Sequence, residues 1–171
     1  SNDTSTNAIG TRASIAGTST SFNGDGNLVF STAPSNGSNT ERMRIDSSGN
    51  VVVGRTNVNT FDVVGHGFRS DGVVSHTADS QAIAYLNRET NDGDLVVFRK
   101  DNSTVGSIGT LSGDLAIGTT DTGLRFHDSG NRIQPFNLST NANSDGVVDL
   151  GVTGGRFKDL YLSGGVYLGG T

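Results

Sequence analysis

The chain has 171 residues, no cysteine and no tryptophan, with 32% apolar residues and a formal net charge of −5. This composition excludes disulfides and thiolate metal sites, and the acidic balance, with a pI near 4.9, argues against nucleic acid as the main partner. No apolar run reaches the roughly 20 residues of a membrane helix.

Apolar residues are scarce for a compact domain of this length, yet β-branched residues recur in short runs among 25 glycines. Short strands joined by glycine turns fit this composition best. The chain starts with a low-complexity run of Ser, Asn, Asp and Thr and has no initial methionine. We therefore expect it to be a segment of a longer polypeptide.

In chain order, residues 1–40 are rich in Ser, Thr, Asn and Gly and predict a mixture of weak strands and loops with flexible first residues. The segment 41–75 begins with the clearest hairpin. Apolar residues alternate with Arg42 and Arg44, the turn 46–50 follows, and β-branched residues alternate beyond it. We expect the arginines to face solvent and four side chains to face inward: Met43, Ile45, Val51 and Val53. Residues 61–65 and 68–74 predict a further strand–turn–strand unit.

The segment 76–134 holds one alternative. Residues 78–86 could form a helix, but we favour a hairpin in which 84–88 pairs with 95–99 across the turn 91–94. Turn residues then recur about every ten positions, which is typical of a many-stranded β architecture. Residues 126–133 form an irregular repeat of the hairpin around residues 44–51.

The segment 135–171 combines a polar loop, 137–144, with a terminal hairpin of strands 160–162 and 166–168. Gly49 and Gly164 are expected in turns that need a positive φ or close backbone approach. The remaining core candidates are apolar residues of the predicted strands: Leu95, Val97, Ile117, Leu124, Phe126, Leu150, Phe157, Leu160, Leu162, Val166 and Leu168.

Two stretches resemble a known family. The sequence ERMRIDSSGNVVVG, at 41–54, and the sequence RFKDLYLSGGVYLGGT, at 156–171, are similar to segments of bacteriophage tail-fibre proteins. The resemblance implies a homotrimer that belongs to the virion and is assembled in the host cytoplasm. Its partners would be two further copies, other fibre or tail proteins, and a host-surface receptor such as a glycan. It implies neither nucleic acid binding nor membrane insertion.

The small supply of core residues in one chain also indicates an oligomer. Each predicted hairpin has one narrow apolar face, and an isolated hairpin is marginal in water. We therefore predict an all-β, elongated homotrimeric fibre of short strands and hairpins sharing a three-fold core, with little or no helix. A monomeric sandwich or solenoid is the alternative architecture.

Residues that carry chemistry are sparse. The clusters 25–27 and 91–94 lack the glutamate that completes an EF-hand loop and contain ordinary turn residues. His66, His76 and His127 are far apart in sequence and form no His-x-His pair, although one histidine per chain could make a three-ligand site on a three-fold axis.

Paired carboxylates for sugar cleavage could come only from scattered aspartates, Asp121, Asp128, Asp145 and Asp149, and no nucleophile motif occurs. We predict no catalytic, cofactor-binding or metal site, no cofactor and no enzymatic activity. The predicted function is a structural segment of a tail fibre supporting host attachment. The alternatives are a carbohydrate-binding or carbohydrate-cleaving spike, and another virion or cell-surface trimeric fibre or adhesin.

Overall fold

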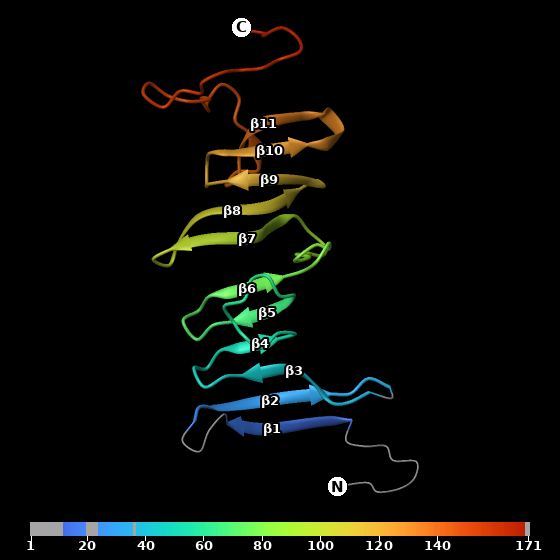
Figure 1. Ribbon diagram of the computed structural model, residues 1–171. Helices are drawn as coiled ribbons and strands as arrows, with labels where there is room; N and C mark the ends of the chain where they lie inside the picture. The colour runs from blue at the N-terminus through green and yellow to red at the C-terminus, as the bar shows by residue number, and fades with distance from the viewer. Residues whose placement is uncertain (1–11, 20–23, 36, 170–171) are drawn as a thin grey trace, which may run out of the picture. The chain divides into compact units, whose positions relative to one another are not determined.

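The computed structural model describes residues 12–19, 24–35 and 37–169, and these residues form an all-β protein. The chain divides into two units, residues 1–85 and residues 86–171, which are described separately. Each unit contains one six-stranded antiparallel sheet whose strands follow one another in sequence order (Figure 1). The first residues of the chain, which the sequence predicts to be flexible, lie outside the described residues.

Sheet A belongs to the first unit. Its strands are β1 (Ala13–Ser19), β2 (Gly26–Thr32), β3 (Thr40–Ile45), β4 (Val51–Val53), β5 (Gly65–Phe68) and β6 (Val74–Thr77). Strand β2 pairs with β3, so the sheet continues across the boundary expected at residue 40.

The hairpin β3–β4 forms where the alternation around residues 46–50 predicts it. Met43 pairs with Val53 and Ile45 with Val51, so these four side chains share one face of sheet A. The turn is a three-residue loop ending in Gly49, whose φ of +80° is the left-handed conformation that glycine adopts without steric cost.

The carboxylate of Asp46 fixes this turn. Its Oδ1 accepts from the backbone N–H groups of Ser48 and Asn50 at 2.9 Å each, and its Oδ2 accepts from Asn50 Nδ2 at 2.9 Å. Asn50 Oδ1 in turn accepts from the backbone N–H of Ser70, at 2.9 Å, in the turn that joins β5 to β6. The two turns are therefore linked by one short hydrogen-bond chain.

Sheet B belongs to the second unit. Its strands are β7 (Gly93–Lys100), β8 (Ser103–Leu111), β9 (Asp114–Gly118), β10 (Gly123–His127), β11 (Arg132–Asn137) and β12 (Ala142–Asn143), with a 3-10 turn, η1 (Asp128–Gly130), between β10 and β11. Two-residue loops close the first two hairpins. Asp101 and Asn102 have φ values of +48° and +64°, and Ser112 and Gly113 have +51° and +85°. Positive φ at both loop residues is the geometry that matches strand twist in a tight hairpin.

Three expectations about strands are wrong. Residues 61–64 are bends, and the strand begins only at Gly65. Residues 84–88 are irregular, because β7 pairs with β8 across the tight Asp101–Asn102 loop instead of with the segment that precedes it.

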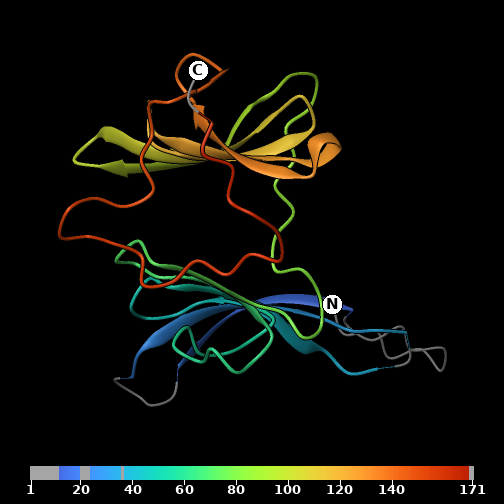
Figure 2. The ribbon, with the colours of Figure 1, turned by 90° about the horizontal axis from the view of Figure 1, so that it is seen from above.

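The third concerns the C-terminal segment. Residues 157–169 contain no strand, and Gly164 has neither a positive φ nor a close neighbour. Figure 2 shows the orange-to-red segment after β12 as irregular chain. Two three-residue strands alone bury too little surface to be stable in water.

The helix considered for residues 78–86 is absent, as expected, and so is any α-helix from the described part of the chain. That part accordingly contains no helix with the length and apolarity needed to cross a membrane.

Candidate functional site

Each sheet has one face that its own loops cover and one face that they leave open. Directly paired residues of neighbouring antiparallel strands lie on the same face of a sheet. We define the open face of sheet A by its two rows of paired residues, Leu28–Ile45–Val51–Phe68–Val74 and Phe30–Met43–Val53–His66–His76.

The open face of sheet A is apolar and accessible. Phe68 is 45% exposed and Val74 is 54% exposed, although both continue the same row as the half-buried Ile45 and Val51. The row begins at Leu28, which is also exposed. Exposed contiguous apolar surface of this kind marks an interaction site more often than a solvated face.

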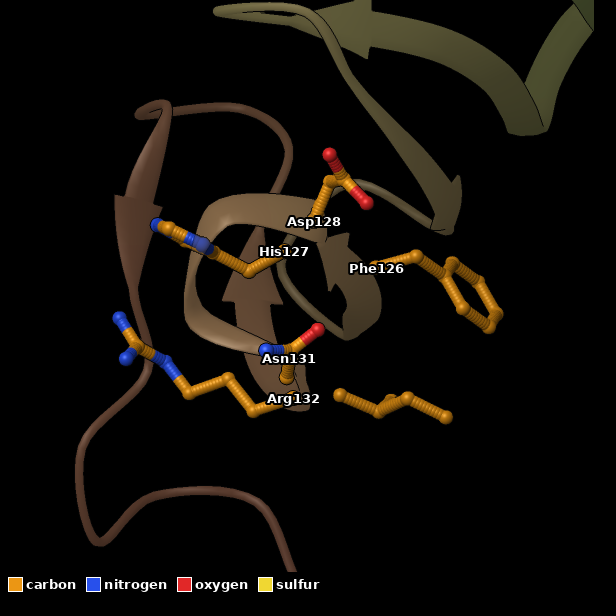
Figure 3. Close-up of a pocket in the computed structure, with 6 residues that line it drawn as sticks. Phe126, His127, Asp128, Asn131 and Arg132 are labelled. Carbon is orange, nitrogen blue, oxygen red and sulfur yellow. The ribbon is translucent and has the colours of Figure 1, made fainter.

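Sheet B repeats this arrangement. We define its open face by the rows Val96–Ile108–Ile117–Leu124–Pro135 and Thr110–Leu115–Phe126–Ile133. Phe126 is 39% exposed and Ile133 is 63% exposed. Figure 3 shows the Phe126 ring on one side of the β10–β11 hairpin, with His127 and Arg132 on the other.

The covered face of sheet A is closed by a buried arginine. Arg55 is 5% exposed, and its guanidinium donates to the carbonyl oxygen of Thr60 at 2.5 Å and to the hydroxyl of Ser75. A Cβ on Gly67 would lie 2.5 Å from Arg55 Nη2, so only glycine leaves room for this side chain. Val52, the direct partner of Gly67 in β4, is fully buried.

Arg44 lies on the same covered face, opposite Val52. Its guanidinium donates to both carboxylate oxygens of Glu41, and this hydrogen bond is the main cause that raises the pKa of Arg44. The side chain is only 22% exposed, so the expectation that Arg44 faces solvent is wrong. Arg42 is exposed, as expected.

The covered face of sheet B combines one aromatic ring with a buried ion pair. Phe136 is 1% exposed, and the Arg125 guanidinium lies 5.9 Å from its ring centroid. Arg125 Nη2 is 2.6 Å from Asp114 Oδ2, and Asp114 Oδ1 accepts from the backbone N–H of Asp128 at 3.0 Å. The hydrogen bond from Asp128, with help from Arg125, lowers the pKa of Asp114 against the opposing effect of desolvation.

The hollow drawn in Figure 3 lies at the end of the β10–β11 hairpin. His127 Nδ1 accepts from the backbone N–H of Gly130 at 3.0 Å and so caps the 3-10 turn. Ser129 Oγ is 3.4 Å from the same nitrogen. Because this nitrogen already accepts a backbone hydrogen bond, the contact is a turn cap and does not form an activated nucleophile.

The core candidates of the second unit lie on different faces of sheet B or outside that sheet. Ile117, Leu124 and Phe126 share the open face, whereas Val97 pairs with Ser107 on the covered face. The register shift between Asp94 and Val96 leaves Leu95 without a direct partner and moves Val96 to the open face. The candidates beyond β12 lie outside the sheet and are exposed: Leu150, Phe157, Leu160, Leu162, Val166 and Leu168.

Of the scattered aspartates, Asp121 and Asp149 line one hollow together with Asn143 and Ser144. Asp128 lines a different one, at the hairpin turn. The described residues contain no group of three or more His, Cys, Asp or Glu side chains arranged to hold a metal ion.

Sequence reasoning missed the contact between two histidines. His66 and His76 are directly opposite each other on β5 and β6, with their Nδ1 atoms 2.7 Å apart. The signal was present in the hairpin register, because both residues are five positions from Asp71 at the centre of the turn. Separation in sequence was therefore no measure of separation in space for these two.

Comparison with protein-family models, with curated proteins and with solved structures finds no match for this chain.

Proposed function

We propose that the chain is a structural segment of a homotrimeric phage tail fibre that supports attachment to the host. The observation that carries the proposal is the distribution of apolar side chains. Most of the larger apolar residues of both sheets lie on the open faces, whereas the buried apolar residues among the described positions are Val29, Val52, Val58, Ala116 and Phe136.

The open faces need cover from outside the sheet. Full burial of a Val, Leu, Ile or Phe side chain contributes about 1.5–3 kcal/mol relative to exposure. Two further copies of the chain around a three-fold axis would supply that cover symmetrically, and a closed symmetric assembly leaves no apolar surface free for further association. The motifs shared with tail fibres favour this arrangement over other oligomers.

The C-terminal segment supports the same reading. Residues 156–169 carry leucine, tyrosine and valine side chains that are exposed in the single chain. In a trimer, this segment can form strands that pack against the equivalent segments of the other copies. The second of the two stretches that resemble tail fibres includes these residues.

The test is the mass of the purified chain by light scattering. We expect about three times the chain mass of 17.7 kDa, over a tenfold range of protein concentration. A single species of 17.7 kDa at all concentrations would overturn the trimer. The attachment role is tested separately, by measuring adsorption of virions that carry a shortened segment, which should attach more slowly with unchanged genome packaging.

An assay for reducing sugar released from host polysaccharide separates this function from a carbohydrate-cleaving spike. We expect no release. Because Asp121 and Asp149 line the same hollow, release that disappears in Asp121→Asn or Asp149→Asn would favour the enzyme.

A further inference from the structure

The histidine pair of sheet A is a preformed two-nitrogen site. His66 and His76 are both exposed, and their ring centroids are 4.8 Å apart with an angle of 67° between the ring planes. The two Nδ1 atoms face each other at 2.7 Å, so one donates a proton and the other accepts it. Strand β6 is an edge strand, which leaves one side of the pair free of further strands.

The hairpin β5–β6 holds both rings in place. On the covered face, Gly65 and Gly67 flank His66 and pack against Arg55, so β5 cannot shift without displacing that buried guanidinium. On the open face, the Phe68 ring lies 6.1 Å from the His76 ring, edge to face. The two imidazoles are therefore fixed by backbone pairing on one side and by packing on the other.

The separation of the two nitrogens matches one coordination geometry best. Metal–imidazole bonds of about 2.0–2.1 Å place two nitrogens about 2.8–3.0 Å apart at a right angle and about 3.3–3.4 Å apart at a tetrahedral angle. The observed 2.7 Å is nearer to the right-angled arrangement. Right-angled coordination by nitrogen is typical of Cu²⁺ and Ni²⁺, and imidazole suits both ions.

We propose that His66 and His76 bind one Cu²⁺ or Ni²⁺ ion through their Nδ1 atoms. Each imidazole then carries its proton on Nε2, so two neutral rings need only a change of tautomer and lose no proton. Water completes the coordination, because the described residues offer no third His, Cys, Asp or Glu ligand there. Both nitrogen ligands come from one chain and lie at the β6 edge of the open face of sheet A.

The test is a titration of the full chain with CuCl₂ at about pH 8, above the range in which histidines commonly titrate. Calorimetry should give one ion per chain. Because two linked ligands bind far more tightly than one, His66→Asn and His76→Asn should each weaken binding on the order of 100-fold. The matched control is His127→Asn, which removes the isolated histidine and should leave the affinity unchanged.

Two further measurements show whether the variants are folded and whether the copper binds specifically. Circular dichroism without metal should be the same for wild type and both pair variants, and metal should raise the melting temperature of the wild type alone. Electron paramagnetic resonance should show two nitrogen ligands in the wild type and fewer in either variant. Equal affinity of the wild type and the double variant, or equal loss in His127→Asn, would overturn the site.

Discussion

The open and the covered face of each sheet differ in how much of their apolar surface a single chain buries. The covered faces combine buried polar groups, Arg55 in sheet A and the Asp114–Arg125 pair in sheet B, with the buried apolar residues Val52 and Phe136. The open faces carry phenylalanine, leucine, isoleucine and valine. In a self-sufficient domain the larger apolar residues are the ones that become buried.

This difference separates two kinds of stability. Interactions on the covered faces are made within one chain, so substitutions there should change the free energy of unfolding independently of protein concentration. Apolar side chains on the open faces stay partly exposed in one chain. Substitutions there should therefore change assembly, and their effect should depend on protein concentration.

The largest effect is expected from Val53→Asp on the open face of sheet A. A carboxylate at this position would be buried without a partner in the assembly and should cost several kcal/mol per chain. Light scattering should detect a shift to the monomer at concentrations at which the wild type is assembled. Val147→Asp makes the same change at a position outside both sheets, 77% exposed, and should leave the mass unaltered. Equal dissociation by both variants would refute the assignment of the open face.

On the covered face, Arg55→Ala should destabilise the first unit by about 3 kcal/mol, because it leaves a cavity and removes the donors to Thr60 and Ser75. Hydrogen exchange should show this loss in the strands of sheet A, at every protein concentration. Arg42→Ala removes an exposed arginine from the same sheet and should change stability by less than about 0.5 kcal/mol.

Gly49→Val tests the turn that joins strands β3 and β4. A β-branched residue at φ +80° should cost about 2 kcal/mol. Gly164→Val, at a position without positive φ or close neighbours, should cost under about 0.5 kcal/mol in the monomer. Thermal unfolding measures both. A similar melting temperature for the two variants would contradict the turn geometry.

The smallest effect is a pH dependence of the covered face of sheet B. The folded-state pKa of Asp114 is lowered, so the ionised form stabilises the fold above its ordinary value near 3.8, and this contribution is lost as the pH falls through the lower folded value. Hydrogen exchange in β9 and β10 should therefore accelerate below about pH 4. Asp114→Asn should remove that acid-dependent step, whereas Asp121→Asn should preserve it.

The sequence predicted the strand content and several turns, because those features are local. The alternation around residues 46–50 specifies both strands of the β3–β4 hairpin and the glycine at its turn. Choice of partner is not local. Residues 95–99 are flanked by two possible turns, one at 91–94 and one at Asp101–Asn102. The strand pairs across the second turn, because the φ values of that two-residue loop match the strand twist.

The sequence did not show which face of each sheet is covered by loops of the same chain. Alternation placed Met43 and Arg44 on opposite faces correctly, but apolar character was a poor guide to burial within one chain. Arg44 is held against the covered face by Glu41, a contact between residues of one strand that hydrophobic periodicity does not reveal. Arg55 was missed for the same reason, since its binding partners are backbone carbonyls and a hydroxyl.

The order of strands in both sheets has a consequence for how the chain is made. In the described residues each strand pairs only with its immediate predecessor and successor. Contact order is therefore low for an all-β protein, and the entropic cost of closing the loop between two paired strands is small. When a strand leaves the ribosome, the preceding strand with which it pairs has already been synthesised. Each sheet can therefore grow by one strand at a time during synthesis.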